Sequence, residues 1–281
     1  MNDSIRKLLK NYPQILSKVS DSPELDIELL LSKVLKVSRE YLHAWGDYLL
    51  TDKQCLDFHF LLQKRKDGKP MAYILGKRAF WSLILKVTPD TLIPRPETEL
   101  LVDVILRKFI SIKNLSILDL GTGSGAIALA LAIEQPTWKV TALDFSIESL
   151  KIAQENAKNY NIVSVNFIHS NWYSNLKNRN YDVIVSNPPY IAKSDLSLNK
   201  YVLQYEPKTA FISDHFGLAD IIKIVDGSKY FLKKNGFIIL EHGYQQNDKV
   251  KNILIEHSYM NIESYSDLSG VIRAVSGSSL Y

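Results

Sequence analysis

The feature that most constrains this chain is a regular alternation of strand-like and helix-like apolar segments from about residue 100 to the end. The pattern predicts strands over residues 116–120, 140–143, 165–169, 182–186 and 236–241, with further strands near the C-terminus. It predicts helices over residues 97–109, 126–134, 147–160, 217–232 and 247–256. Because repeated strand–helix units of this length pack helices on both faces of a sheet, we predict an α/β fold with a doubly wound, mostly parallel sheet.

The segment before this pattern is predicted to contain only helices. Its apolar residues recur near i, i+3, i+4 and i+7, in four clusters, and DGKP at 67–70 then breaks the pattern. Asp52 is the predicted N-terminal cap of the fourth helix, with Thr51 as an alternative. We expect residues 1–75 to form a small helical domain that takes part in recognition.

The stretch between these two parts has a third character. FWSLILKVTPDTLI at 80–93 mixes aromatic and β-branched residues with the turn-like pair Pro89 and Asp90. This composition predicts a short hairpin. We therefore divide the chain into a helical domain (1–75), a hairpin linker (76–95) and an α/β domain (96–281).

Composition narrows the possible environments and partners. The net charge is only +4, which permits contact with nucleic acid without requiring it. Cys55 is the single cysteine and the six histidines are scattered, so we predict neither a disulfide nor a metal site. The densest apolar run, 126–133, is too short to span a bilayer, and no secretory signal opens the chain. We expect a cytoplasmic protein.

A glycine-rich turn follows the first predicted strand of the α/β domain, within SILDLGTGSGAIALALA at 116–132. Glycines allow a tight turn and close approach to a ligand, and the helix behind the turn presents free backbone N–H groups. The turn alone could be only a turn, but its place between strand and helix favours a cofactor site. The residues assigned to this site are Asp119, Gly121, Thr122, Gly123, Ser124 and Gly125.

Two carboxylates decide which cofactor this loop suits. Asp119 precedes the first glycine, where it would repel a pyrophosphate but suit a ligand that carries an ammonium and a sulfonium. Asp144 ends the next predicted strand, where a carboxylate can accept hydrogen bonds from both ribose hydroxyls. With the adjacent Phe145, it is assigned to the nucleoside. Asp144 could instead cap the helix that begins near residue 147. The combination favours S-adenosylmethionine over NAD, with S-adenosylhomocysteine as the product.

A second motif, SNPPYI at 186–191, directly follows another predicted strand. Its prolines remove two N–H donors, which leaves the side-chain oxygen of Asn187 and the carbonyl of Pro188 as acceptors for a planar NH₂ group. Tyr190 can stack on that group. Ligands collect at this edge of such sheets, so we predict that Asn187, Pro188, Pro189 and Tyr190 bind the substrate and promote methyl transfer. A merely rigid loop is the alternative.

The chain resembles the release-factor glutamine methyltransferases over nearly its whole length. NPPY occurs in other amino-methyltransferases as well and identifies the chemistry only. The family-specific phrases are FWSLILKVTPDTLIPRPETELLV at 80–102, YEPKTAFISDHFGLADI at 205–221 and LEHGYQQ at 240–246.

The resemblance implies a substrate and several site residues. The substrate would be the glutamine of the Gly-Gly-Gln loop of bacterial-type peptide-chain release factors, methylated on its side-chain amide nitrogen, and the N-terminal domain would help to dock it. The matching cofactor-site residues are the 121–125 loop, Asp144, Trp172 and Asn187. Asn171 stands where the family often has Asp, but it can still accept from an adenine amine. Arg95, in the IPRPETE phrase, is assigned to substrate binding, with a helix start as an equal alternative.

Other functions remain open from the sequence. The exocyclic amine of adenine in DNA or RNA is also planar, so NPPY could bind it, although such an enzyme must flip its base and hold the backbone with cations. The weak net charge and the lack of a clustered basic domain count against that function, and the one dense basic run, KRKDGK at 64–69, is better interpreted as a solvated helix end. A non-catalytic binding module would be expected to have lost one of the motifs, and both are intact. We expect a monomer that acts on a protein.

Overall fold

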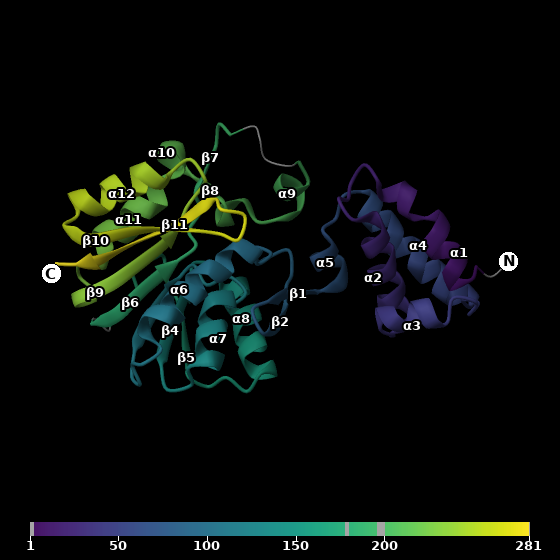
Figure 1. Cartoon of the computed structure of the whole chain (residues 1–281), viewed down its shortest axis with the longest axis horizontal. Coiled ribbons are helices and arrows are strands. Elements are labelled where there is room, and N and C mark those ends of the chain that lie inside the picture. Colours follow the sequence, from purple (N-terminus) through teal and green to yellow (C-terminus); the bar gives the residue numbers. More distant parts are fainter. Residues whose placement is uncertain (1–2, 178–179, 196–199, 281) are drawn as a thin grey trace. The chain divides into compact units, whose positions relative to one another are not determined.

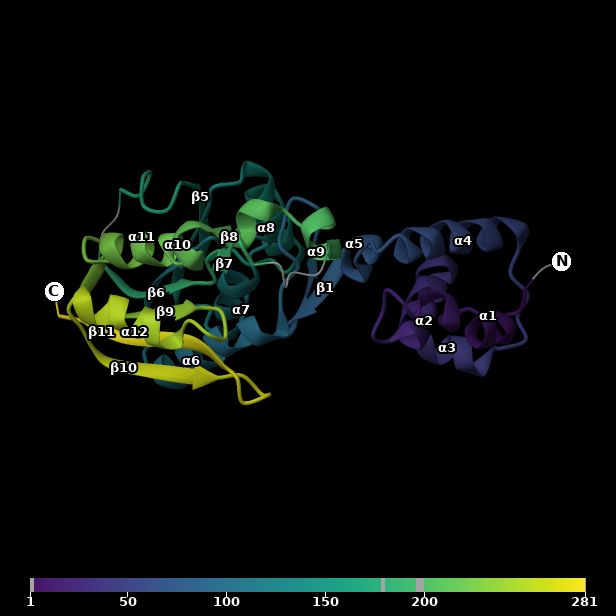
Figure 2. The ribbon, with the colours of Figure 1, turned by 90° about the horizontal axis from the view of Figure 1, so that it is seen from above.

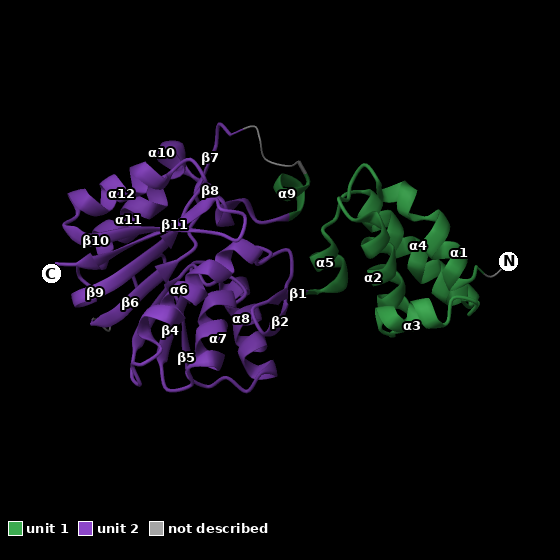
Figure 3. Ribbon diagram, in the orientation of Figure 1, with its two compact units in different colours: residues 1–77, 200–205 green, residues 78–199, 206–281 purple. Residues whose placement is uncertain are grey.

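The computed structural model describes residues 3–177, 180–195 and 200–280. The chain forms two compact units, residues 1–77 with 200–205 and residues 78–199 with 206–281 (Figure 3). The three-part division made from the sequence stays a prediction. Among the described residues, no helix combines the length and apolar character that a membrane crossing requires.

The first unit is a bundle of helices (Figure 1). Its elements are α1 (Ile5–Asn11), the 3₁₀ helix η1 (Pro13–Leu16), α2 (Pro23–Leu35), α3 (Arg39–Ala44), α4 (Asp52–Lys66), α5 (Met71–Leu75) and α9 (Lys200–Tyr205). Its core holds Ile5, Leu8, Leu16, Ile27, Leu30, Leu31, Leu42, Leu50, Phe58, Leu62 and Ile74. These residues include members of all four apolar clusters in the sequence, so the helical periodicity explains the bundle.

The cap of α4 is Thr51 and not Asp52. The Thr51 hydroxyl accepts from the Gln54 backbone N–H at 3.3 Å, and Gln54 Oε1 accepts from the Thr51 N–H at 2.9 Å. This reciprocal pair is a capping box. The primary prediction of Asp52 was wrong, because Asp52 is already the first helical residue and its neighbour takes the capping position.

The second unit is built on a seven-stranded sheet (Figures 1 and 2). Its strands are β3 (Ser116–Leu120), β4 (Lys139–Asp144), β5 (Val165–His169), β6 (Tyr181–Ser186), β9 (Leu232–Glu241), β10 (Tyr259–Ser266) and β11 (Ile272–Ser279). Their order is β10-β11-β9-β6-β3-β4-β5. The five strands from β9 to β5 in this order run parallel, and β11 and β10 add an antiparallel edge. This confirms the predicted doubly wound, mostly parallel sheet.

Helices cover both faces of this sheet. The covering helices are α6 (Glu99–Phe109), α7 (Ala126–Glu134), α8 (Ile147–Asn159), α11 (Ala219–Ser228) and α12 (Asn247–Glu256). Ile117 of β3 packs in a core with residues of α6, α7 and α8, whereas the next residue, Leu118, packs in a second core with residues of α11 and α12. Successive strand residues face opposite sides of a sheet, so an uninterrupted apolar strand such as β3 is expected when both faces are covered.

Two boundaries differ from the sequence-based expectation. The helix predicted over 217–232 ends at Ser228, because Phe231 and Leu232 join the sheet-side core and β9 already begins at Leu232. The hairpin forms between β1 (Lys77–Phe80) and β2 (Leu83–Lys86) and turns at Trp81. Pro89 and Asp90 form a separate, later turn, as their turn-like character predicted.

Short elements complete the unit around the ends of the parallel strands. They are η2 (Pro96–Thr98), β7 (Ile191–Ala192), η3 (Lys208–Ala210), β8 (Ile212–Ser213) and α10 (Asp214–Gly217). β7 pairs in parallel with β8, which ties the segment after β6 to the segment before α11.

Candidate active site

The glycine turn connects β3 directly to α7, and its three glycines have left-handed backbone angles. Their φ values are 76° at Gly121, 57° at Gly123 and 87° at Gly125. A Cβ atom on Gly123 would meet nothing within 4 Å, and one on Gly121 would face only the Trp172 ring, at 3.7 Å. At Gly125 a Cβ would come within 2.9 Å of the Leu129 side chain. The first two glycines therefore open space for a ligand, while the third allows close packing of α7.

Asp144, at the end of β4, is bound to the same turn. Its Oδ2 accepts from the Gly123 N–H and its Oδ1 from the Ser146 N–H, both at 2.8 Å. Burial raises the pKa of Asp144, although these two N–H donors oppose the shift. The cap of α8 is Ser146, whose hydroxyl accepts from the Ser149 N–H. Each Asp144 oxygen still has a lone pair, so the carboxylate can accept from a ligand as well.

One cavity of about 410 Å³ brings the two motifs together. It lies in the second unit, beyond the carboxyl ends of the parallel strands, where ligands bind in such folds. The sequence-predicted residues that line it are Gly121, Gly123, Asp144, Phe145, Asn171, Trp172, Asn187 and Pro189. Its wall also contains residues that the sequence analysis did not assign to a site, namely Pro89, Asp90, Leu92, Leu143, Ser146, Glu148, Ser149, Ser170, Pro207, Thr209, Ala210 and Asp220.

The remaining residues assigned to the cofactor do not line this cavity. Asp119 is fully buried and accepts from the Thr122 hydroxyl at 2.7 Å, and burial raises its pKa to about 7. Thr122, Ser124 and Gly125 also belong to the supporting side of the loop. Their direct contact with a cofactor stays a prediction. In the structure they support the conformation of the loop on the side that faces away from the cavity.

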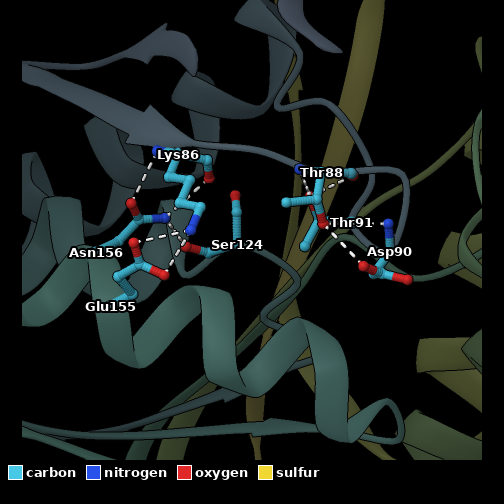
Figure 4. A network of polar contacts seen from close by, with 7 residues as sticks. All are labelled: Lys86, Thr88, Asp90, Thr91, Ser124, Glu155 and Asn156. Atoms are coloured by element: carbon cyan, nitrogen blue, oxygen red, sulfur yellow. Dashed lines mark hydrogen bonds and ion pairs between the residues drawn. The ribbon is translucent and has the colours of Figure 1, made fainter. Parts of the chain in front are cut away.

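A buried amide holds the glycine loop to the hairpin (Figure 4). Asn156 of α8 is fully buried. Its Nδ2 donates to the Ser124 carbonyl at 2.9 Å and to the Lys86 carbonyl at 3.1 Å, and its Oδ1 accepts from the Lys86 N–H at 2.8 Å. One side chain thus fixes the loop against β2, which precedes the cavity-lining turn at Pro89 to Leu92.

Another part of the cavity wall is formed around Trp172. Its backbone has a φ of 47°, and its indole Nε1 donates to Asp220 at 3.3 Å. Asp220 also accepts from the Ser213 hydroxyl at 2.7 Å. Asn171 is exposed at the rim of the cavity, as is Phe145. The aromatic surfaces of Phe145 and Trp172 suit a flat, apolar ring such as a nucleobase.

The NPPY motif begins at the end of β6. Asn187 lines the cavity, and its Nδ2 donates to the Thr98 hydroxyl at 2.9 Å. Pro188 is buried and Pro189 is on the cavity wall. Tyr190 is outside the lining, and its hydroxyl donates to Glu241 at 3.1 Å. Burial raises the pKa of Tyr190 well above its ordinary value, so the phenol stays protonated.

The structure gives the residues of the IPRPETE phrase other partners. The Arg95 guanidinium contacts the buried Glu206 carboxylate at 2.6 Å, and Glu206 also accepts from the Ile93 N–H at 3.0 Å. Glu99 accepts from the Trp81 N–H at 2.8 Å. Arg95 thereby joins the segment before α6 to the EPKTA segment, and its assignment to substrate binding stays a prediction.

Several site residues could not be found from local patterns. Pro207, Thr209 and Ala210 belong to the EPKTA phrase, so the family resemblance pointed to their segment without giving them a role. Thr98 and Glu241 contact the NPPY motif from distant parts of the sequence. They too lie in family-specific phrases, which gave them no role, and no periodicity signals them. Over the described ranges, no group of three His, Cys, Asp or Glu side chains is arranged to hold a metal ion.

Two family models match separate parts of the chain. Residues 96–204 match the Methyltransferase small domain family, and residues 7–76 match the PrmC N-terminal domain family. A crystal structure of a methyltransferase from Pyrococcus furiosus superimposes with a TM-score of 0.53 at 19% identity, covering 71% of this chain and 90% of the other. At that identity the similarity shows the fold alone.

Curated relatives are much closer in sequence. The release factor glutamine methyltransferase of Coxiella burnetii is 45% identical over 270 residues, which cover 96% of this chain and 97% of the relative. The enzyme of the same name from Escherichia coli is 41% identical over 260 residues, covering 92% and 94% respectively. With identity at this level over nearly the full length of both chains, the protein belongs to the release factor glutamine methyltransferase family.

Proposed function

We propose that this protein transfers a methyl group from S-adenosylmethionine to the side-chain amide nitrogen of the glutamine in the Gly-Gly-Gln motif of peptide-chain release factors. The observation that carries the proposal is the shared cavity, since the glycine turn with Asp144 and the NPPY motif with Asn187 line the same space. Methyl transfer needs a donor and an acceptor held in line within one site.

The residues of one wall fit S-adenosylmethionine, which would supply the methyl group. Gly121 and Gly123 have no side chains that would fill the cavity beside the turn, and Asp144 has lone pairs available for two ribose hydroxyls. Phe145 and Trp172 offer aromatic surface for the adenine, and Asn171 offers a polar edge. Among the described residues that line the cavity, none is a lysine or arginine of the kind that would mark a pyrophosphate site.

The side of the cavity that Asn187 and Pro189 line, with the buried Pro188 between them, fits a primary amide. We assign the Asn187 side-chain oxygen and the Pro188 carbonyl as acceptors for the two N–H bonds of the glutamine. An amide nitrogen is a weak nucleophile because its lone pair is delocalised, and two acceptors can favour a geometry that directs the lone pair toward the methyl group. The rate gain then comes mainly from positioning and from a preorganised polar site.

Proton loss needs no strong base in this scheme. Once the nitrogen carries the methyl group, its extra proton is acidic and can leave to water or to a neighbouring acceptor. Tyr190, whose pKa burial raises well above the ordinary value, is not that base. Stacking of Tyr190 on the substrate amide would require its ring to reach the cavity, because in this structure Tyr190 lies outside the lining and its hydroxyl donates to Glu241.

The wider setting follows from the proposed substrate. We propose that the N-terminal helical domain (1–75) recognises the release factor, that the linker (76–95) supports the cavity, and that residues 96–281 catalyse transfer. Because release factors act in translation, the protein is placed in the cytoplasm, and it is expected to act as a monomer without membrane or nucleic-acid partners.

The test is a transfer assay with radiolabelled S-adenosylmethionine and an unmodified release factor. A matched substrate has its Gly-Gly-Gln glutamine replaced by alanine, and separate reactions contain single-stranded and duplex DNA with adenine. Label on the glutamine, located by mass spectrometry and absent from the alanine substrate, supports the proposal. Label on DNA alone would reject it in favour of the adenine-amine reaction.

A further inference from the structure

A continuous chain of hydrogen bonds leads from a buried carboxylate to the NPPY motif. The Thr98 hydroxyl donates to Glu241 Oε2 at 2.7 Å, and the Asn187 Nδ2 donates to the same Thr98 oxygen at 2.9 Å. The other Glu241 oxygen accepts from the Tyr190 hydroxyl at 3.1 Å. The chain joins the end of β9, the start of α6 and the loop after β6.

The direction of this chain is set by chemistry. An ionised carboxylate only accepts hydrogen bonds, and a threonine hydroxyl has a single proton to donate. Since Thr98 donates that proton to Glu241, its oxygen can only accept from Asn187. The NH₂ end of the Asn187 side chain must therefore face Thr98, and its oxygen is left for the cavity.

Thr98 lies where η2 runs directly into α6. It is the last residue of η2, and its backbone is already helical, with φ −68° and ψ −20°, so its hydroxyl is not required to cap a helix N–H. The Thr98 side chain makes no such bond, and it is buried. Its hydrogen bonds serve Asn187 and Glu241 and not the helix end.

We infer that Thr98 and Glu241 are positioning residues that fix the orientation of the Asn187 amide, so that its oxygen and not its NH₂ group meets the substrate nitrogen. This inference rests on the proposed function. The two ends of an asparagine side chain have nearly the same shape, so packing alone discriminates poorly between them. A reversed amide would present N–H donors to the N–H bonds of the glutamine and lose the acceptor.

The surroundings of Glu241 set the conditions for the test. Glu241 is 2% exposed, and burial raises its pKa to about 7. The Thr98 and Tyr190 donors and the charge of Arg273 lower the pKa, whereas Glu97 raises it. His242, the next residue, has its own pKa lowered by burial and stays neutral. Measurements at pH 8 therefore examine the ionised carboxylate.

The primary experiment compares Thr98→Val with Thr98→Ser in the full chain. Valine keeps the shape of threonine without the hydroxyl, whereas serine keeps the hydroxyl. We expect the valine variant to lower kcat with the release factor about 10- to 100-fold, as loss of one oriented polar group in an active site does. The serine variant should retain kcat within about threefold, and the dissociation constant of S-adenosylmethionine should change little in both.

A second variant, at Glu241, tests the hydrogen-bond chain from its carboxylate end. Glu241→Gln leaves one acceptor oxygen for two hydroxyl donors and adds a competing donor. It should lower kcat to a similar extent as Thr98→Val. Because both substitutions act through the same amide, their effects should not add. The kcat of the double variant should lie within about twofold of the kcat of the slower single variant.

A readout without catalysis separates this inference from the proposed function. In ¹⁵N-labelled protein, the Asn187 side-chain NH₂ signal, assigned by its loss in Asn187→Ala, should exchange with solvent more than about tenfold faster in Thr98→Val than in the wild type or Thr98→Ser. Thr137→Val is the control for removal of a hydrogen-bonded threonine hydroxyl outside this network. Thr137 is exposed, and its hydroxyl donates to the Lys113 carbonyl before the start of β4, at the amino ends of the parallel strands.

The outcomes are distinct. If the wild type does not methylate the release factor but the Asn187 signal responds as described, the proposed function fails and the hydrogen-bond chain stands. Equal kcat loss in Thr98→Val and Thr98→Ser, or an Asn187 signal that Thr98→Val leaves unchanged, would overturn the inference. A loss of the same size in Thr137→Val would also overturn it, because the effect would then be general destabilisation.

Discussion

At the residue scale, Asp144 joins the glycine turn to the predicted ribose site. Its carboxylate accepts from Gly123 and Ser146 and faces the cavity. Asp144→Ala removes the acceptors for two ribose hydroxyls and also frees the turn. We expect calorimetric titration to show S-adenosylmethionine binding about 10- to 100-fold more weakly. Asp103→Ala, which removes a half-buried carboxylate paired with the exposed Arg107, is the control and should not change affinity. Unchanged affinity in Asp144→Ala would mean that the ribose binds elsewhere.

Asn187 is expected to act on transfer more than on cofactor binding. Its side-chain oxygen is the assigned acceptor for the glutamine, and its nitrogen is bonded to Thr98. Asn187→Ala should lower kcat at least about 100-fold, because an oriented acceptor is lost at the reacting nitrogen. S-adenosylmethionine binding should remain measurable by calorimetry in the same preparation. Full activity in this variant would remove the NPPY mechanism.

Asp119 gives a pH dependence of stability with a definite sign. Burial raises its pKa from 3.8 to about 7, so the folded protein holds this proton more tightly than the unfolded chain. The stabilisation is fully present below about pH 4 and is lost as the pH rises through about 7. In urea unfolding between pH 4.5 and 8, Asp119→Asn should lose less stability than the wild type, with a difference on the order of a few kcal/mol.

The wild-type slope in that experiment also contains Glu241, whose pKa burial raises to about 7. Comparison with Asp119→Asn isolates the Asp119 contribution, because Glu241 is present in both proteins. Parallel pH profiles for the two proteins would show that Asp119 is ionised in the folded state throughout this range.

At the element scale, α8 supports the cavity through two neighbouring side chains that differ in burial (Figure 4). Asn156 is fully buried and bonds both Lys86 and the Ser124 carbonyl, whereas Glu155 is exposed and pairs with Lys86 at 2.7 Å. Asn156→Ala leaves buried backbone groups without partners and should cost about 2 to 3 kcal/mol in urea unfolding. Glu155→Ala removes only a surface pair and should cost less than about 1 kcal/mol.

The same two variants should also differ in their affinity for S-adenosylmethionine. Asn156→Ala frees the glycine loop, so S-adenosylmethionine affinity should fall several-fold at a temperature where the variant is folded, whereas Glu155→Ala should bind normally. Equal behaviour of the two variants would show that the loop keeps its shape without the amide.

How far the sequence predicts this molecule also depends on the kind of element. β3, the glycine turn and α7 follow from a buried apolar strand, three glycines and an apolar helix in direct succession. The end of α11 could not be predicted in this way. Phe231 and Leu232 continue the helical apolar spacing, but in the structure they pack in the core of the sheet, and Leu232 begins β9. Thr51 replaced Asp52 as a cap because both residue types cap well and only the register of the helix decides.

Local motifs in the sequence pointed to several of the residues that the structure brings into one cavity. The cavity brings together Gly121, Asp144, Trp172 and Asn187, each identified from a strand end or from the family resemblance. The hydrogen bonds that join Glu241, Thr98 and Asn187 could not be predicted from local patterns, because Thr98 is 89 residues from Asn187 and 143 from Glu241. Local patterns carry no information on contacts between segments so far apart.

At the scale of the whole molecule, the helical unit has apolar side chains that its own core does not use. Leu56 and Phe60 of α4 are 72% and 61% exposed, although Phe58 between them is fully buried. Residues four apart lie on the same helix face, so the pair forms an exposed apolar strip. Lys64, one turn further along α4, places its ammonium 4.0 Å from the Phe60 ring. Such a strip with a cation beside it is suited to a protein partner.

We predict that this strip contributes to recognition of the release factor and not to chemistry. Leu56→Ser combined with Phe60→Ser should raise KM for the whole release factor about tenfold, as loss of large apolar contacts does at protein interfaces. The kcat value at saturating release factor and the affinity for S-adenosylmethionine should not change, because the cavity is built entirely from residues of the other unit. The matched control is Ile255→Ser with Met260→Ser, which removes two exposed apolar side chains, 59% and 49% exposed, from α12 and β10. An unchanged KM in the α4 variant, or an equal rise in the control, would assign recognition to another surface.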